Sequence, residues 1–173
     1  MLYRDVDRHT IETGTAAQLE LETRADLADA SLLLVEQAKL RVDIYSRELD
    51  PLVYDNIEFI DALKSLCLSH AKTRVRILAQ RPERAIRDGH GLIRLAQRIS
   101  SFIELRQTAR EHATNNFALM IADERYFLYR EMADRFEGEL VFGDAIRTRE
   151  LCARFNTIWS AATQPADFRR LSL

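Results

Sequence analysis

The apolar and polar residues of this chain repeat with two different periods, and these periods alternate along the sequence. Over residues 17–21 apolar and polar residues alternate one by one, which is the pattern of a strand with one buried face. Thr23 and Asp26 then have the spacing of a helix-capping box, and apolar residues recur at helical spacing as far as Ala38. The same reasoning predicts strands at 42–46, 74–79, 101–106, 116–122, 126–130 and 140–142, and helices at about 53–70, 92–99 and 144–162.

The predicted strand at 116–122 differs from the first one because its residues from Phe117 to Ala122 are all apolar. A strand without alternation is typical of a position that is covered on both faces of a sheet. Proline and glycine residues between 81 and 91 predict a loop. Strands separated by helices favour an α/β fold with a mixed sheet layered with helices.

The length and composition predict one soluble globular domain. Residues 1–173 are interpreted as a single domain in which residues 1–15 form a weakly patterned N-terminal arm. The chain has no apolar run of the roughly 18 residues that a membrane span needs, and its N-terminus does not resemble a signal peptide. Cys67 and Cys152 both lie in helical apolar patterns and are interpreted as buried free thiols, which favours a cytoplasmic location.

The charges are distributed unevenly although the net charge is only -2. Residues 72–110 carry 10 Lys and Arg against 3 Asp and Glu, whereas residues 1–71 carry 7 against 14. A basic block of this kind can form an anion-binding face, or it can form ion pairs with the acidic N-terminal third. The pattern of residues leaves both interpretations open.

The segment from Asn116 to Leu128 resembles the signature strand of the phospholipase D superfamily, whose pattern is His-x-Lys-x4-Asp. Asp123 stands at the Asp position, while Asn116 and Ala118 stand at the His and Lys positions. The order of predicted elements over roughly residues 25–163 also resembles one half of a phospholipase D-like fold. The chain is similar as well to a small bacterial domain of unknown function found with acetyltransferase units, but it has no acetyl-CoA-binding Gly-rich loop.

The resemblance implies a degenerate, noncatalytic unit. In the family the His attacks phosphorus and the Lys neutralises the phosphoryl oxygens, and the two side chains share one face of the strand because they are two residues apart. An Asn amide can hydrogen-bond an anion but is no nucleophile at neutral pH, and Ala118 supplies no charge. Asp123 is either a positioning group of the site or an ordinary turn residue.

Two other histidines and two arginines are candidates for the same site. His112 lies four residues before Asn116, and His90 lies between two glycines in the basic block, so either is a candidate for residual phosphodiesterase or nuclease catalysis. Arg98 and Arg106 are candidates for anion contacts. No residue spacing predicts a metal site, a P-loop or a dinucleotide-binding fingerprint, and no cofactor is expected.

The sequence therefore predicts a binding module for a phosphate-bearing or other anionic ligand, or for an acidic partner protein. A residual phosphodiesterase and a structural protein-interaction module are the alternatives. Nucleic acid is a further candidate ligand, but it is not favoured because the chain is acidic overall with a pI near 6.1. Superfamily enzymes with a single motif form two-fold dimers, so the resemblance implies a homodimer with Asn116 near its axis.

Overall fold

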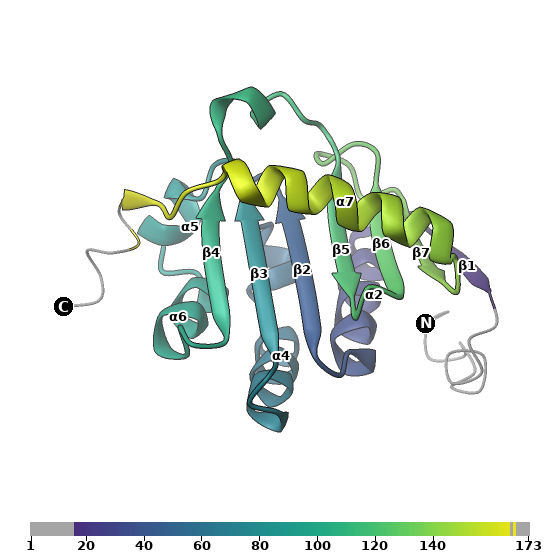
Figure 1. Cartoon of the computed structure of the whole chain (residues 1–173), viewed down its shortest axis with the longest axis horizontal. Helices are drawn as coiled ribbons and strands as arrows, with labels where there is room; N and C mark the ends of the chain where they lie inside the picture. The colour runs from purple at the N-terminus through teal and green to yellow at the C-terminus, as the bar shows by residue number, and fades with distance from the viewer. Residues whose placement is uncertain (1–15, 167, 169–173) are drawn as a thin grey trace.

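The computed structural model of the chain describes residues 16–166 and residue 168, and the predicted N-terminal arm lies outside them. The described part contains one mixed sheet of seven strands in the order β1-β7-β6-β5-β2-β3-β4. The strands are β1 (Ala17–Leu21), β2 (Arg41–Ser46), β3 (Arg74–Ala79), β4 (Ile103–Gln107), β5 (Ala118–Ala122), β6 (Tyr126–Arg130) and β7 (Gly138–Phe142). The predicted fold class, an α/β fold with a mixed sheet layered with helices, is confirmed (Figure 1).

Helices provide the crossovers of the parallel half of the sheet. They are α2 (Arg24–Gln37), α3 (Pro51–Tyr54), α4 (Ile57–Ser69), α5 (Glu83–Arg87), α6 (Gly91–Arg98) and α7 (Ala145–Ala161), with a 3₁₀ turn, η2 (Arg110–His112), before β5. Because β2, β3 and β4 pair in parallel, the chain must return between them, through α3 and α4 first and then through α5 and α6. β5 runs antiparallel to β2, and β6 and β7 follow as antiparallel neighbours.

The two faces of the sheet are covered unequally. Figure 1 shows α7 lying across one face, while α2 and α4 lie behind the other. Within β5, Met120 belongs to the larger core beneath α2, α4 and α6, and Leu119 and Ile121 belong to the smaller core beneath α7. All five residues of β5 are buried, so the prediction of a strand covered on both faces is confirmed.

Local capping explains where the elements begin. The predicted capping box is confirmed: Thr23 accepts a hydrogen bond from the Asp26 amide, and the Asp26 carboxylate accepts one from the Thr23 amide. The prediction of one helix over 53–70 is wrong, because the Asn56 side chain accepts from the Phe59 amide and starts a separate helix, α4. The segment 81–91 is likewise not all loop, since it contains the short helix α5.

The two cysteines are both free thiols. Cys67 is buried as predicted, and Cys152 on α7 is half-buried. Burial raises the pKa of each thiol to about 11, so neither is an activated nucleophile near neutral pH. Within the described residues no helix has the length and apolar character to cross a membrane.

Candidate functional site

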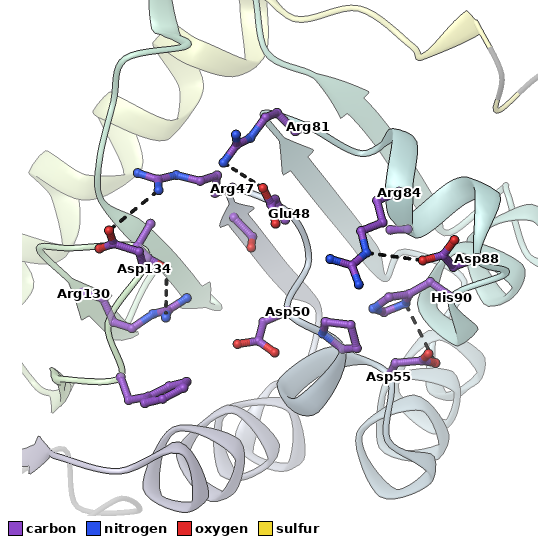
Figure 2. Close-up of a pocket in the computed structure, with 15 residues that line it drawn as sticks. Arg47, Glu48, Asp50, Asp55, Arg81, Arg84, Asp88, His90, Arg130 and Asp134 are labelled. Carbon is purple, nitrogen blue, oxygen red and sulfur yellow. Dashed lines mark hydrogen bonds and ion pairs between the residues drawn. The ribbon is translucent and has the colours of Figure 1, made fainter.

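A pocket with a volume of about 370 Å³ opens at the edge of the sheet where β2, β3 and β6 end. Its walls come from residues 46–51 after β2, from the segment 81–90 after β3, and from the end of β6 with the connection to β7 (Figure 2). Ligands of open α/β sheets bind in the crevice outside the carboxyl ends of the strands, and this volume lies within the usual range for small-molecule sites.

The pairing of β5 with β6 places a cation beside Ala118, the position that the motif resemblance aligns with a lysine. Ala118 and Arg130 are direct cross-strand partners in this antiparallel pair. Side chains of direct partners lie on the same face about 4.5–5.5 Å apart at Cβ. This is the face of Met120 and of the larger core, so Arg130 lies on the side of the sheet that a lysine at position 118 would occupy.

Arg130 is a buried arginine that lines the pocket with only 3% of its surface exposed. Its Nη1 donates to the backbone carbonyls of Ala133 and Arg135, at 3.3 and 2.7 Å, and its Nε has no hydrogen-bond partner. Within the described part of the chain it forms no ion pair with a carboxylate. A buried charge is usually paired, because desolvation without a partner costs several kcal/mol. The site therefore holds an uncompensated positive charge.

Asn116 does not line the pocket itself, but it is bonded to two residues that do, Arg47 and Ala133. The Asn116 Oδ1 accepts a hydrogen bond from Nη2 of Arg47, the residue that follows β2. Its Nδ2 contacts the Met132 sulfur at 3.0 Å, and its backbone carbonyl accepts from the Ala133 amide at 2.6 Å. Arg47 and Arg130 thus both line the pocket, and Asn116 is joined to it through Arg47.

The remaining charges of the pocket fall into paired and unpaired groups. Arg81 pairs with Glu48 at 2.7 Å, Arg84 pairs with Asp88 at 3.4 Å, and Arg47 reaches Asp134 at 4.0 Å. Asp50 and Asp55 also line the pocket, and their carboxylates accept hydrogen bonds from the backbone amides of Leu52 and Gly91. The pocket is therefore not uniformly basic.

His90 is the one candidate histidine that lines the pocket, and its ring is fixed by backbone groups. The Leu92 amide donates to Nδ1 at 3.2 Å, so Nε2 carries the proton and donates to the Leu49 carbonyl at 3.1 Å. Burial lowers the pKa of this imidazole, and the Asp55 carboxylate, 3.9 Å from Nδ1, offsets part of that effect. His90 is thus a neutral residue that caps α6 and links it to Leu49.

The buried His90 imidazole should make the unfolding free energy depend on pH. An unfolded His titrates near pH 6.5, so the stability gained from neutral His90 is present above that pH and is lost as the pH falls towards the lowered pKa of the folded state. We expect the loss of unfolding free energy between pH 7.5 and pH 5 to be smaller in His90→Asn, whose amide can still cap α6. Urea denaturation over this range measures it, with His70→Asn on the exposed end of α4 as the control. Equal pH dependence in wild type and His90→Asn would contradict the assignment.

Asp123 lies at the opposite end of β5 from Asn116. Its carboxylate accepts hydrogen bonds from the backbone amides of Lys39, Leu40 and Arg41, at 2.6, 2.9 and 2.8 Å. Five strand residues at about 3.3 Å each separate it from the pocket end of the strand. The structure thus holds Asp123 in the junction between α2 and β2 and does not bring it to Asn116.

The other candidates are not brought to the pocket either. Arg98 is exposed in the last turn of α6, away from the end that His90 caps. Arg106 lies on β4, where its guanidinium covers the Trp159 ring of α7 at 4.3 Å and its Nε donates to Glu104. His112 lies in η2, with its Nε2 3.5 Å from Glu111, and it is not a lining residue of the pocket.

The basic block of residues 72–110 uses part of its charge in ion pairs. Arg76 forms a bidentate pair with buried Asp43 of β2, at 2.7 Å to each oxygen, and Arg81 pairs with Glu48. These two contacts connect the block to the acidic N-terminal third. Arg84 and Arg106 pair with acids of the block itself. Among the described residues, no group of three or more His, Cys, Asp or Glu side chains could hold a metal ion.

Sequence reasoning missed the arginines that matter most in the pocket. Arg47 directly follows β2 and Arg81 is the second residue after β3, and side chains at carboxyl ends of parallel strands meet at one edge of a sheet. That signal was available in the sequence. Arg130 carries no such signal, because only the strand register shows that it faces Ala118.

Comparison with family models gives one match that covers most of the chain. The model described as a domain of unknown function, DUF7931, matches residues 23–171. Comparison with curated protein sequences gives no match.

Several solved structures share the fold at low sequence identity. Nuc from Salmonella typhimurium, a phospholipase D family member, is 13% identical with a TM-score of 0.62, over 87% of this chain and 98% of that one. NucT from Helicobacter pylori is 10% identical with a TM-score of 0.57, and the match covers 87% of this chain and 99% of NucT. TrmBL2, an archaeal chromatin protein with a novel mode of DNA binding, is 13% identical with a TM-score of 0.63, and this chain covers 58% of its length. The phospholipase D-like fold expected from the motif strand is thereby confirmed.

Proposed function

The chain belongs to the DUF7931 family, and we propose that it is a noncatalytic phospholipase D-like binding module that holds a phosphate-bearing or other anionic ligand in the pocket beside Asn116. The family description assigns no activity. The similarity to Nuc and NucT concerns the fold, and it does not assign their activities to this chain. Support for the proposal therefore comes from the pocket itself.

The buried guanidinium of Arg130 is the observation that carries the proposal. It lines a pocket, lies opposite Ala118, and has no carboxylate partner within the described residues. An anion at this point would supply the missing countercharge and an acceptor for the unpartnered Nε. Charge-assisted hydrogen bonds from arginine to phosphate are among the strong polar contacts in proteins, and the planar fork suits two phosphate oxygens.

The same residues argue against turnover. Asn116 replaces the motif nucleophile, and its side chain is bonded to Arg47 and Met132. Catalysis by His90 would require its ring to leave two backbone groups, and His112 contacts Glu111 outside the pocket. Residual phosphodiesterase activity is thus the weaker alternative. A structural interaction module is the other alternative, and the homodimer with Asn116 near its axis stays a prediction.

The proposal predicts that phosphate stabilises the wild-type protein. We expect sodium phosphate or methyl phosphate to raise the melting temperature relative to sodium chloride of equal ionic strength. Binding to the folded state alone adds RT ln(1 + [L]/Kd), about 2.7 kcal/mol at a hundredfold excess over Kd. The rise should shrink as sodium chloride is added, because salt screens the contact. No rise with phosphate, methyl phosphate or an oligonucleotide at low salt would overturn the proposal.

An activity assay separates the alternatives. We expect no turnover of bis-p-nitrophenyl phosphate, because the described pocket lacks a free nucleophilic histidine. Turnover that is lost in His112→Ala or in His90→Ala but kept in His70→Ala would favour the residual phosphodiesterase instead. A mobility shift with single-stranded DNA serves the same purpose for nucleic acid, which the net charge of -2 does not favour.

A further inference from the structure

The pocket contains unpaired charges of both signs, and they face each other. Figure 2 shows the Arg130 guanidinium entering from the sheet side, with the Asp50 carboxylate opposite it at the start of α3. Arg130 and Asp50 form no ion pair with each other, because each lacks an oppositely charged partner within 4.0 Å among the described residues. The other arginines that line the pocket, Arg47, Arg81 and Arg84, already have acidic partners.

The Asp50 carboxylate is held in place while one oxygen stays available. Its Oδ1 accepts from the Leu52 amide at 3.0 Å, which caps α3, and its Oδ2 has no hydrogen bond within the described part of the chain. Asp55 lines the same side of the pocket, with Oδ1 bonded to the Gly91 amide at 2.6 Å. Two carboxylates therefore stand on the helix side, across from one buried cation on the sheet side.

A ligand that is only anionic meets an unfavourable field in this arrangement. Its negative group would gain from Arg130 but would be repelled by Asp50, which lines the same partly desolvated pocket, where charges are weakly screened. A positive group on the same ligand would turn the second interaction into an attraction. Matching of charges across a site is a means of specificity, since the wrong sign at one position is rejected.

We propose that the pocket takes a small dipolar molecule, with its phosphate or phosphonate group against Arg130 and a protonated amine against Asp50. This inference rests on the proposed anion binding and narrows it to one class of ligand. A pocket of about 370 Å³ has room for a molecule of this size.

Three related probes test the proposal on the intact chain. They are 3-aminopropylphosphonate, which carries both charges, butylphosphonate, in which a methyl group replaces the amine, and butylamine, which lacks the anion. We expect calorimetry to show that aminopropylphosphonate binds about tenfold more tightly than butylphosphonate and that butylamine does not bind measurably.

Removing the negative charge of Asp50 should remove this preference. Asp50→Asn keeps an oxygen that can cap α3, so the fold should be retained. We expect the affinity ratio to fall from about tenfold to about twofold or less, with butylphosphonate bound at least as tightly as by the wild type. Asp144→Asn, the same charge change at the capping residue of α7 outside the pocket lining, is the matched control and should leave the ratio unchanged. Asp50→Ser, another capping residue, replaces Asp50→Asn if that variant does not fold.

The outcomes distinguish this inference from the proposal on which it rests. Equal affinity of the wild type for aminopropylphosphonate and butylphosphonate overturns the dipolar ligand but leaves anion binding intact. An unchanged ratio in Asp50→Asn and Asp50→Ser overturns the assignment of the amine to Asp50. No binding of either phosphonate overturns both.

Discussion

Replacing Arg130 with methionine is expected to abolish stabilisation by phosphate. Methionine fills a similar elongated space but carries no charge, so the pocket loses the cation that an anion would meet opposite Ala118. Truncating one partner of a buried, hydrogen-bonded charge pair typically costs at least about 2 kcal/mol, which is about a thirtyfold rise in Kd. Calorimetric titration with methyl phosphate measures the Kd, and thermal denaturation with and without phosphate gives an independent reading.

Arg98→Met is the matched control for this experiment. It makes the same substitution and the same change in net charge, but at an exposed residue in the last turn of α6. Its affinity for methyl phosphate should remain that of the wild type. Arg130→Lys gives a second test, because it keeps the charge while losing the planar fork that donates to Ala133 and Arg135, and we expect an intermediate Kd. Wild-type affinity in folded Arg130→Met would mean that the anion binds elsewhere.

Local sequence patterns predicted the strands and helices of this chain, but they did not predict that Arg130 lines the pocket. The strand β5 could be recognised because its unbroken apolar run has one good explanation, burial on both faces. The capping box of Thr23 and Asp26 and the alternation of strand and helix periods depend on residues within four positions of one another, and both are confirmed. A site depends on residues from several elements, and here Arg47 and Arg130 line one pocket only after the sheet has formed.

The excess of arginine in residues 72–110 is real, but these arginines have several different roles in the structure. This excess suggested one anion-binding face, but the arginines point in different directions. Arg76 and Arg106 cover the rings of Trp159 beneath α7, while Arg81 and Arg84 line the pocket on the other side. Sequence position cannot separate these roles, because residues of one strand alternate between faces and residues of one helix point around its axis.

The motif resemblance pointed to the end of β5 next to the pocket, although two of its three motif residues are replaced. Asn116 is bonded to Arg47, which lines the pocket, and Arg130 lies beside Ala118, the position that the resemblance aligns with a lysine. A cation supplied by the neighbouring strand could not be found by reading the motif strand alone. Asp123, at the third motif position, is held by three backbone amides, and a mutation should measure what these contacts contribute.

Asp123→Ala is expected to lower the free energy of unfolding by about 2–4 kcal/mol, because three backbone amides lose a charged acceptor at once. Asp123 and Glu124 both have positive φ, at 52° and 56°, in the tight turn between β5 and β6. Asp tolerates this conformation better than Ala, which adds to the loss. Asp123→Asn should lose less, because its amide oxygen can still accept from Leu40 and Arg41. Urea denaturation monitored by circular dichroism gives these values.

The control is Glu124→Ala in the same turn, which removes an exposed ion pair with Arg41 at 2.5 Å and should cost about 1 kcal/mol or less. The decisive comparison is between stability and binding. If Asp123 only ties the turn to the start of β2, folded Asp123→Ala should bind methyl phosphate as tightly as the wild type, since it lies at the far end of β5 from the pocket. A higher Kd with little loss of stability would instead mean that Asp123 contributes to ligand binding.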